Sequence, residues 1–382
     1  MRKSNRGTVD PFIVMDVMEA ARKAEEGGAR IIHMEVGQPG TGAPRIAMEA
    51  VAREMRENPL GYTVALGLPA LRARIARLYD EWYGIDLDPN RVIVTPGSSG
   101  AFLLTFTALF DNGDRVGLGA PGYPSYRQIM KAVGLEPVVI EAAPENGYQL
   151  CAQDLAGQRL DGLMMASPAN PTGTMLDRDQ LAAIMEGAER ESAAFISDEI
   201  YHGIEYNKKA VSALQVSDET YVINSFSKYF SMTGWRVGWM VVPQEHVRII
   251  ERLAQNMFIC APHVAQVAAL AALDAGAELQ SNLEVYRANR DMMLDGLAKA
   301  GFDKIAPPDG AFYIYADVSA YTDDALAFAA EILEKAGVAV TPGLDFDPGR
   351  GGQFLRFSYA RSCDDIREGI SRLQTFMRVR RT

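Results

Sequence analysis

The sequence has little cysteine and no long hydrophobic run. Cysteine occurs at only three of 382 positions, Cys151, Cys260 and Cys363. Their odd number and wide spacing predict no disulfide framework and favour a reducing, cytoplasmic location. Residues 1–10 lack the apolar core of a signal peptide. The longest run of small apolar residues, 264–273, is too short to span a bilayer, so we expect no membrane partner.

Basic residues and histidines are also scarce. Lysine and arginine total 38 against 49 aspartates and glutamates, so the net charge is −11, and no basic run is present. Nucleic acid is therefore not an expected partner. The four histidines show no metal-ligand spacing, so we expect no bound metal. A chain of this length predicts two domains, or one large domain with an appendage.

Seven short apolar runs between residues 91 and 242 predict strands separated by helices. Most are rich in Val, Ile, Leu and Met without alternation, which is typical of strands covered on both faces. We therefore expect an α/β fold, a three-layer sandwich with a mostly parallel seven-stranded sheet. The predicted strands are Arg91–Thr95, Arg115–Ala120, Glu136–Glu141, Gly162–Ala166, Ala194–Asp198, Tyr221–Asn224 and Val237–Val242.

Both ends of the chain predict a second, smaller α+β unit. The N-terminal segment is too short for a fold of its own, so we expect it to join the C-terminal part. The predicted boundaries are residues 46–285 for the large domain and residues 1–45 with 286–382 for a discontinuous small domain. The C-terminal part has expected strands at 311–317 and 354–359 and expected helices at 323–336 and 363–376.

A lysine follows the sixth predicted strand. The segment Ser225-Phe226-Ser227-Lys228 continues to Arg236. A lysine amine can form a Schiff base with a carbonyl cofactor or substrate. Hydroxyls and an arginine can hold a phosphate beside it. Together with a carboxylate for a ring nitrogen, these groups are what pyridoxal phosphate requires from a protein.

Two other strand ends supply an anion site and a carboxylate. Gly97-Ser98-Ser99-Gly100 precedes an expected helix at 101–110, whose free amides could bind phosphate, although a simple capped turn is the alternative. Asp198 ends a buried strand and needs a partner, which could be a pyridinium N–H or a helix terminus. Alternation along the chain points Glu199 to the other face.

Four more residues have both a functional and an ordinary interpretation. Asn170 could donate to a cofactor ring, but Asn-Pro is also a common turn dipeptide. Tyr201 could reach a ring hydroxyl, and Tyr123 could stack on a ring or simply pack in the core. Arg356 lies in an apolar strand, so it needs an anion, either a substrate carboxylate or a structural aspartate such as Asp317.

The segment Gly117–Gly122 matches the G-x-G-x-x-G pattern of dinucleotide-binding proteins, and Glu141 ends the next predicted strand. However, Gly117 and Gly119 fall within the predicted strand, and prolines occupy the place where a helix should begin. A nicotinamide-dependent oxidoreductase is therefore a remote alternative.

Ten short motifs in order resemble the class I/II, fold-type I aminotransferases that use pyridoxal phosphate. The resemblance covers nearly the whole chain. The motifs are Val36-Gly37-Gln38-Pro39, Gly61-Tyr62-Thr63 with Gly67-Leu68-Pro69-Ala70-Leu71-Arg72, Gly97-Ser98-Ser99, Pro121-Gly122-Tyr123-Pro124, Asn170-Pro171-Thr172-Gly173, Asp198-Glu199-Ile200-Tyr201, Ser225-Phe226-Ser227-Lys228, Gly234-Trp235-Arg236, Gly310-Ala311-Phe312-Tyr313 and Arg356-Phe357-Ser358-Tyr359-Ala360.

The resemblance implies a cofactor role for several of these residues. Lys228 would hold the cofactor as an internal aldimine and then shuttle the proton. Asp198 would pair with the ring nitrogen, Asn170 and Tyr201 would hold the ring oxygen, and Tyr123 would stack on the ring.

It also implies residues for the phosphate and the substrate. The amides of Ser98 and Ser99, with Ser225 and Arg236, would bind the phosphate. Tyr62 would reach the phosphate from a neighbouring subunit, which implies a homodimer with shared active sites. Gly37 and Arg356 would hold the substrate carboxylate.

The expected reaction transfers an amino group between an α-amino acid and a 2-oxo acid. Some aspartate-using members carry a lysine where Ser99 stands, so its absence does not favour a dicarboxylate substrate; Gln38 replaces a usual glutamate, a milder departure. A β-lyase that uses the same cofactor and fold is the nearest alternative. A cofactor-binding regulator is less favoured, because no helix-turn-helix extension precedes the enzyme-like body and the charge is acidic.

Overall fold

A seven-stranded sheet forms the centre of the larger unit in the computed structural model, which describes residues 1–381. The strand order is β2-β8-β7-β6-β5-β3-β4, and only β8 runs antiparallel to its neighbours. The mostly parallel sheet confirms the predicted fold class and all seven predicted strands. Its strands are β2 (Val92–Thr95), β3 (Arg115–Ala120), β4 (Glu136–Glu141), β5 (Gly162–Ala166), β6 (Ala194–Asp198), β7 (Tyr221–Ser225) and β8 (Gly238–Val241).

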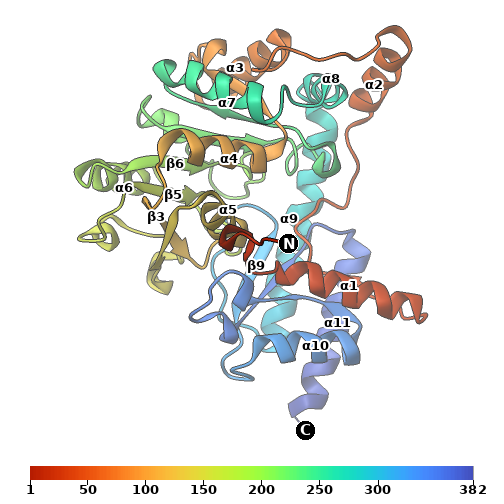
Figure 1. The fold of residues 1–382 in the computed structure, drawn as a ribbon. Helices are drawn as coiled ribbons and strands as arrows, with labels where there is room; N and C mark the ends of the chain where they lie inside the picture. Colours follow the sequence, from red (N-terminus) through yellow and green to blue (C-terminus); the bar gives the residue numbers. More distant parts are fainter. Residues whose placement is uncertain (382) are drawn as a thin grey trace.

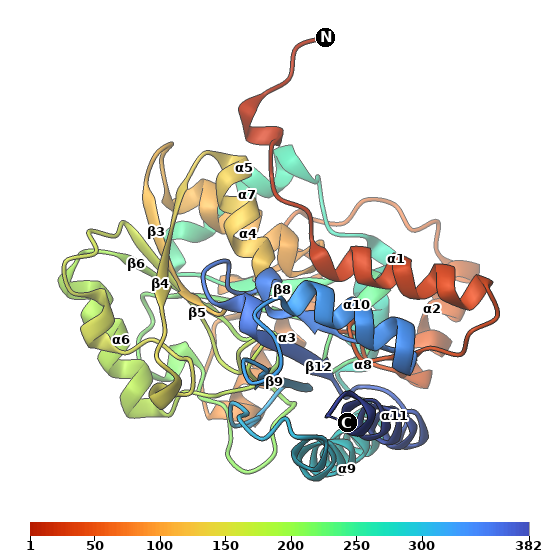
Figure 2. The same ribbon diagram turned by 90° about the horizontal axis from the view of Figure 1, so that it is seen from below.

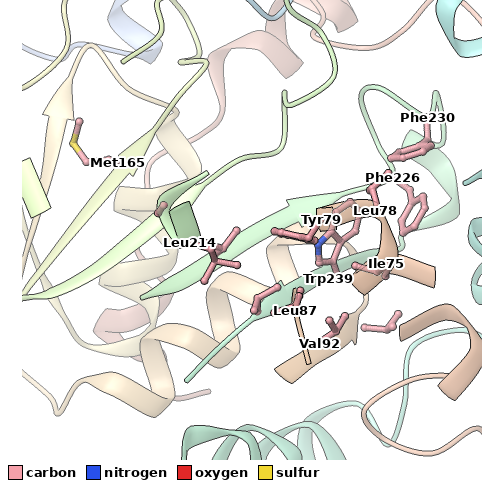
Figure 3. Close-up of a cluster of buried hydrophobic side chains, with 14 of the residues drawn as sticks. Ile75, Leu78, Tyr79, Leu87, Val92, Met165, Leu214, Phe226, Phe230 and Trp239 are labelled. Atoms are coloured by element: carbon pink, nitrogen blue, oxygen red, sulfur yellow. The ribbon is translucent and has the colours of Figure 1, made fainter. Parts of the chain in front are cut away.

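Helices cover both faces of this sheet and make the three layers (Figure 1). Alternate residues of one strand belong to different cores: Trp239 of β8 faces one side and Met240 the other. Figure 3 shows Trp239 beside Tyr79, whose hydroxyl accepts a hydrogen bond from the indole at 3.2 Å. One face carries α4 (Gly97–Leu109), α5 (Pro124–Val133) and α7 (Val247–Met257), and the other α3 (Pro69–Tyr83), α6 (Arg178–Arg190) and α8 (His263–Ala272).

The smaller unit is built from both ends of the chain. A three-stranded antiparallel sheet has the order β11-β12-β9, and a separate parallel pair joins β1 to β10. The β1–β10 pair therefore places the N-terminal segment against the C-terminal part, while the exact domain boundaries stay a prediction. The strands are β1 (Ile32–His33), β9 (Tyr313–Asp317), β10 (Val338–Ala339), β11 (Thr341–Pro342) and β12 (Phe354–Ser358).

Five helices complete the architecture. The long helix α9 starts in the core of the large unit with Leu279 and continues into the core of the small unit (Figure 1). Helix α1 lies beside α10 (Figure 2). These helices are α1 (Ile13–Glu26), α2 (Arg45–Glu57), α9 (Gly276–Ala300), α10 (Ala325–Ala336) and α11 (Cys363–Arg381).

Residues 1–381 lack two features that would point to a membrane or a metal partner. No helix in that range is both long enough and apolar enough to cross a membrane. The same range contains no cluster of three or more histidine, cysteine, aspartate or glutamate side chains placed to hold a metal ion.

Candidate active site

A cavity of about 240 Å³ lies at the carboxyl ends of the central strands, where the two units meet. This is the edge at which open α/β sheets bind ligands. Ten of the twelve residues predicted from the sequence line this cavity. They are Gly37, Ser98, Ser99, Tyr123, Asn170, Asp198, Tyr201, Lys228, Arg236 and Arg356.

Lys228 lies just beyond β7, and its amine faces the cavity. Its Nζ donates a hydrogen bond to the carbonyl oxygen of Gly37 and lies 5.6 Å from the centre of the Tyr201 ring. Burial is the main cause that lowers the pKa of Lys228 to about 7, and the positive charge of Arg356 acts in the same direction. A substantial fraction of this amine is therefore neutral near pH 7, as a nucleophile or base requires.

Asp198 ends β6 and is 3 % exposed. Its carboxylate accepts hydrogen bonds from the hydroxyl of Tyr126 and, at 3.0 Å, from the amide of Ile200. Burial raises the pKa of Asp198 to about 6, although both hydrogen bonds oppose this shift. Asp198 therefore both caps a local turn and presents a carboxylate to the cavity. Glu199 points away, toward the hydroxyl of Ser212.

One end of the cavity is suited to an anion. Helix α4 begins at Gly97, four residues earlier than predicted, so Ser98 and Ser99 lie in its first turn, where amides have no partner within the helix. The guanidinium of Arg236 lies against Gly97 and would collide with a side chain there. This guanidinium donates to the carbonyl oxygen of Thr233 at 3.0 Å and forms no ion pair with a carboxylate of residues 1–381. Free amides beside a cation without a carboxylate partner suit an anion such as phosphate.

Three side chains surround the space between this anion site and Asp198. Tyr123 precedes α5, and its ring lies 5.2 Å from that of Tyr126. Asn170 accepts a hydrogen bond from Arg356 at 2.9 Å through its Oδ1, which leaves its NH₂ group as a donor. The hydroxyls of Tyr201 and Tyr313 are 2.8 Å apart, and burial raises the pKa of Tyr201 well above its usual value.

Arg356 on β12 presents a buried cation to the cavity. Its guanidinium donates to Asn170, to the carbonyl oxygen of Glu35 and to the hydroxyl of Thr341, and its Nε has no partner. Asp317 is not its partner, so that sequence-based alternative is wrong: Asp317 lies opposite Phe354 in the sheet register. A buried guanidinium paired only with neutral groups is a site for an external carboxylate.

Gly37 lies against the ring of Tyr313, and a side chain at position 37 would collide with its phenol oxygen. Only glycine leaves room here, with its carbonyl oxygen turned to Lys228.

Two predicted residues are not brought into the cavity of this single chain. The hydroxyl of Ser225 donates to Ser227 at 2.9 Å, and it is Ser227 that lines the cavity. Tyr62 is 82 % exposed, and its proposed role depends on a second subunit. The roles of all twelve residues stay predictions.

Several lining residues were not predicted as site residues: Phe12, Val14, Met15, Met18, Tyr126, Ser227 and Tyr313. A local signal existed for Tyr126, which follows Tyr123 by three positions and lies in the first turn of α5. The residues from 12 to 18 carry no motif, and only tertiary packing places them over the cavity.

The G-x-G-x-x-G segment does not open a helix. Gly117 and Gly119 lie inside β3, and α5 begins only at Pro124. A side chain at Gly117 would collide with Leu160, so this glycine serves sheet packing rather than phosphate binding.

Comparison with known proteins gives consistent results. The family described as aminotransferase class I and II matches residues 29–373. Valine–pyruvate aminotransferase of Mycobacterium tuberculosis is 46 % identical, with 98 % of each chain covered. A putative aminotransferase from Silicibacter pomeroyi is 70 % identical with a TM-score of 0.95, covering 99 % of this chain and 100 % of that one. Aspartate aminotransferase from Thermus thermophilus, solved with maleate, is 31 % identical with a TM-score of 0.92 at the same coverage.

Proposed function

The chain belongs to the class I and II aminotransferase family and transfers amino groups between α-amino and 2-oxo acids, and we propose that it does so with pyridoxal 5′-phosphate held in the cavity described above. The observation that carries the proposal is the placement of Lys228, Asp198 and Arg236 around one cavity. An amine with a lowered pKa, a buried carboxylate and an unpaired guanidinium match the aldehyde, ring nitrogen and phosphate of this cofactor.

The residues present fit that group at each polar position. The amides of Ser98 and Ser99 and the guanidinium of Arg236 would hold the phosphate, with Ser227 in the cavity and Ser225 behind it. Asp198 would accept the N–H of the ring, and Asn170 and Tyr201 would donate to the ring oxygen. Tyr123 would lie against the ring face.

In the reaction, the cofactor supplies an electron-withdrawing ring that stabilises charge developing at the substrate α-carbon. Lys228 Nζ would remove the proton from the substrate α-carbon, because its neutral form is accessible near pH 7. It would then deliver that proton to the carbon that carries the aldehyde in the free cofactor. Ionised Asp198 would hold the proton on the ring nitrogen, because a negative charge beside that nitrogen favours its protonated form. Arg356 fixes the substrate carboxylate and so orients the α-carbon toward the lysine.

We also propose that the preferred substrates have apolar side chains. The basic residues that line the cavity are Lys228, Arg236 and Arg356, and each already has a role. None is left for a second carboxylate. The similarity to a valine–pyruvate aminotransferase supports this substrate class.

A homodimer with shared active sites completes the proposal. Tyr62, Val64 and Ile259 are exposed apolar residues of one region. Their segments lie close together, as the hydrogen bond of 2.9 Å between the Nδ1 atom of His263 and the carbonyl oxygen of Gly61 shows. A second subunit would cover these residues, and Tyr62 would then reach the phosphate in the partner's cavity.

The test is an absorption spectrum of the purified protein followed by product analysis. The expected result is visible absorption that disappears when an amino acid is added and returns when a 2-oxo acid is added. A β-lyase would instead release ammonia and a 2-oxo acid from one substrate. A protein that stays colourless after incubation with pyridoxal phosphate would contradict the proposal.

A further inference from the structure

Helix α1 begins without a capping side chain of its own. Its N-cap residue is Phe12, which has no side-chain oxygen. The amides of Ile13 and Val14 instead donate to the two carboxylate oxygens of Asp345, each at 3.1 Å. Asp345 is 3 % exposed and comes from the far end of the sequence. A buried carboxylate with both oxygens on the first amides of a helix is a strong attachment for that helix end.

The other contacts at this end of α1 are few. Before the helix, the carboxylate of Asp10 accepts from Gln128 and Lys131 at 3.0 Å each. The buried residues of the helix are Val14 and Ala21. Ala21 packs in the second half of the helix, against Ile31 and Ala339. Within the helix itself, the first half is held mainly by the burial of Val14 and by the contact with Asp345.

The same half of α1 forms one wall of the candidate active site. Phe12, Met15 and Met18 line the cavity together with Arg356. The ring of Phe12 also lies edge-on to that of Tyr123, with the ring centres 5.9 Å apart. These side chains offer only apolar carbon and sulfur atoms to a ligand, so they suit an apolar group and cannot pair with a carboxylate.

Asp345 is joined to the substrate-carboxylate site through the next residue. The ring of Phe346 lies 4.6 Å from the guanidinium carbon of Arg356. The carbonyl oxygen of Phe346 accepts from the amide of Gly122 at 3.0 Å, and Arg127 donates to the carbonyl oxygen of Asp345 at 3.1 Å. The same segment, Asp345 with Phe346, therefore holds α1 and packs on Arg356. This arrangement fixes the distance between the start of α1 and the Arg356 guanidinium.

We propose that Asp345 is a positioning residue that holds α1 over the cavity, so that Phe12, Met15 and Met18 contact the substrate side chain and select apolar ones. This inference rests on the proposed function, because it assumes that Arg356 binds the substrate carboxylate. Asp345 touches neither substrate nor cofactor and acts through α1.

The test compares Asp345→Ala with Asp347→Ala. Asp347 is a matched control, because it is a buried carboxylate of the same segment that bonds to the amides of Gly349 and Arg350 and not to α1. Hydrogen exchange of residues 13–26 should become faster in Asp345→Ala and stay unchanged in Asp347→Ala. This readout needs no activity and no loaded cofactor.

Steady-state kinetics with L-valine and L-alanine give the second readout. In Asp345→Ala the KM for valine should rise by about tenfold, which corresponds to loss of the apolar contact of roughly two methyl groups. The KM for alanine and the cofactor content should change little. Met18→Ala should raise the KM for valine without changing exchange in α1. If Asp345→Ala does not fold, Asp345→Asn, which keeps one acceptor oxygen, should give an intermediate effect on both readouts.

Two results would overturn the inference. One is unchanged exchange of residues 13–26 in both Asp345 variants. The other is an equal rise in KM for valine and alanine, which would indicate general damage to the site. Failure of the proposed function is distinguishable from these, because the wild-type protein would then show no transamination at all.

Discussion

The guanidinium of Arg356 packs on two aromatic rings, with its central carbon 4.4 Å from the centre of Tyr313 and 4.6 Å from that of Phe346. The rings hold the planar fork in one orientation while its Nε remains without a partner. If Arg356 binds the substrate carboxylate as proposed, the cost of orienting the fork has been met before a substrate arrives.

Arg356→Lys should therefore weaken substrate binding and spare the cofactor. Lysine keeps the charge but loses the fork, and a hydrogen bond to a charged group contributes about 1.5–3 kcal/mol, so the KM for amino acids should rise by about 10- to 100-fold. Amines without a carboxylate should be little affected. Arg287→Lys is a suitable control, since Arg287 also lies over a ring, that of Tyr206, outside the cavity. Loss of cofactor binding in Arg356→Lys would assign the arginine a structural role.

Lys228→Ala should fold and should still take up the cofactor through the phosphate site, but turnover should fall by at least about 10²- to 10⁴-fold, as expected for loss of an acid–base group. Borohydride reduction of the loaded wild-type protein should attach the cofactor to the peptide that contains Lys228. Lys208→Ala, which changes a half-exposed lysine paired with Asp309, should behave as wild type. Attachment to any other lysine would refute the assignment.

The pKa of Lys228 can be measured without turnover. In the cofactor-free protein, competitive labelling with acetic anhydride should increase as the pH rises through about 7 and then level off, because the neutral amine is the reactive form. Exposed lysines should continue to gain reactivity toward their ordinary pKa near 10. A labelling midpoint for Lys228 in that ordinary range would show that burial does not lower its pKa.

Asp198→Asn should lower turnover and raise the unfolding free energy of the cofactor-free protein at pH 7.5. The folded pKa of Asp198 is raised from 3.8 to about 6, so the wild-type cofactor-free protein loses unfolding free energy as the pH rises from about 4 to 6. The loss is about 3 kcal/mol at most, at ~1.4 kcal/mol per pKa unit. Asparagine carries no charge and keeps an acceptor for Tyr126, so the variant should be more stable than wild type at pH 7.5 and equal to it near pH 4.

Denaturant titrations of the cofactor-free proteins at the two pH values measure this difference. Turnover of Asp198→Asn should fall severely, because an amide cannot hold the ring nitrogen protonated. Asp364→Asn, at an exposed carboxylate, should change neither quantity. Near-normal turnover in Asp198→Asn would mean that the carboxylate only caps its turn.

Shared active sites can be tested by mixing subunits. Tyr62→Ala and Lys228→Ala should each be impaired alone. A mixed dimer contains one cavity with Lys228 from one chain and Tyr62 from the other, so mixing and refolding should restore part of the activity. Two variants that show only the sum of their separate activities after mixing would indicate that Tyr62 does not serve a neighbouring cavity.

The strands and most of the cavity could be predicted because their signals are local. Asp198 and Lys228 each follow an apolar run, and parallel strands bring their carboxyl ends to one edge. The error at the start of α4 has a local cause too: a run of glycines and serines after a strand is typical of a turn, whereas here it forms the first turn of the helix.

The wall formed by Met15 and Met18 could not be predicted in this way. Its position depends on Asp345, which is remote in sequence, and methionines on an amphipathic helix are ordinary core residues. Ser227 rather than Ser225 reaches the cavity because the chain turns after β7, and a turn removes the alternation by which strand residues are assigned to a face.

The pairing of β1 with β10 has a consequence for the order of events during synthesis. Ile32 is made before the strands of the large unit, and its partner Val338 is made after them. The large unit has its sheet complete by Val241, well before that partner exists. Arg356 follows later still. A growing chain can therefore bring Lys228 and Asp198 together before Arg356 has been made. The residues proposed to hold the cofactor then meet before the residue proposed to hold the substrate carboxylate is present.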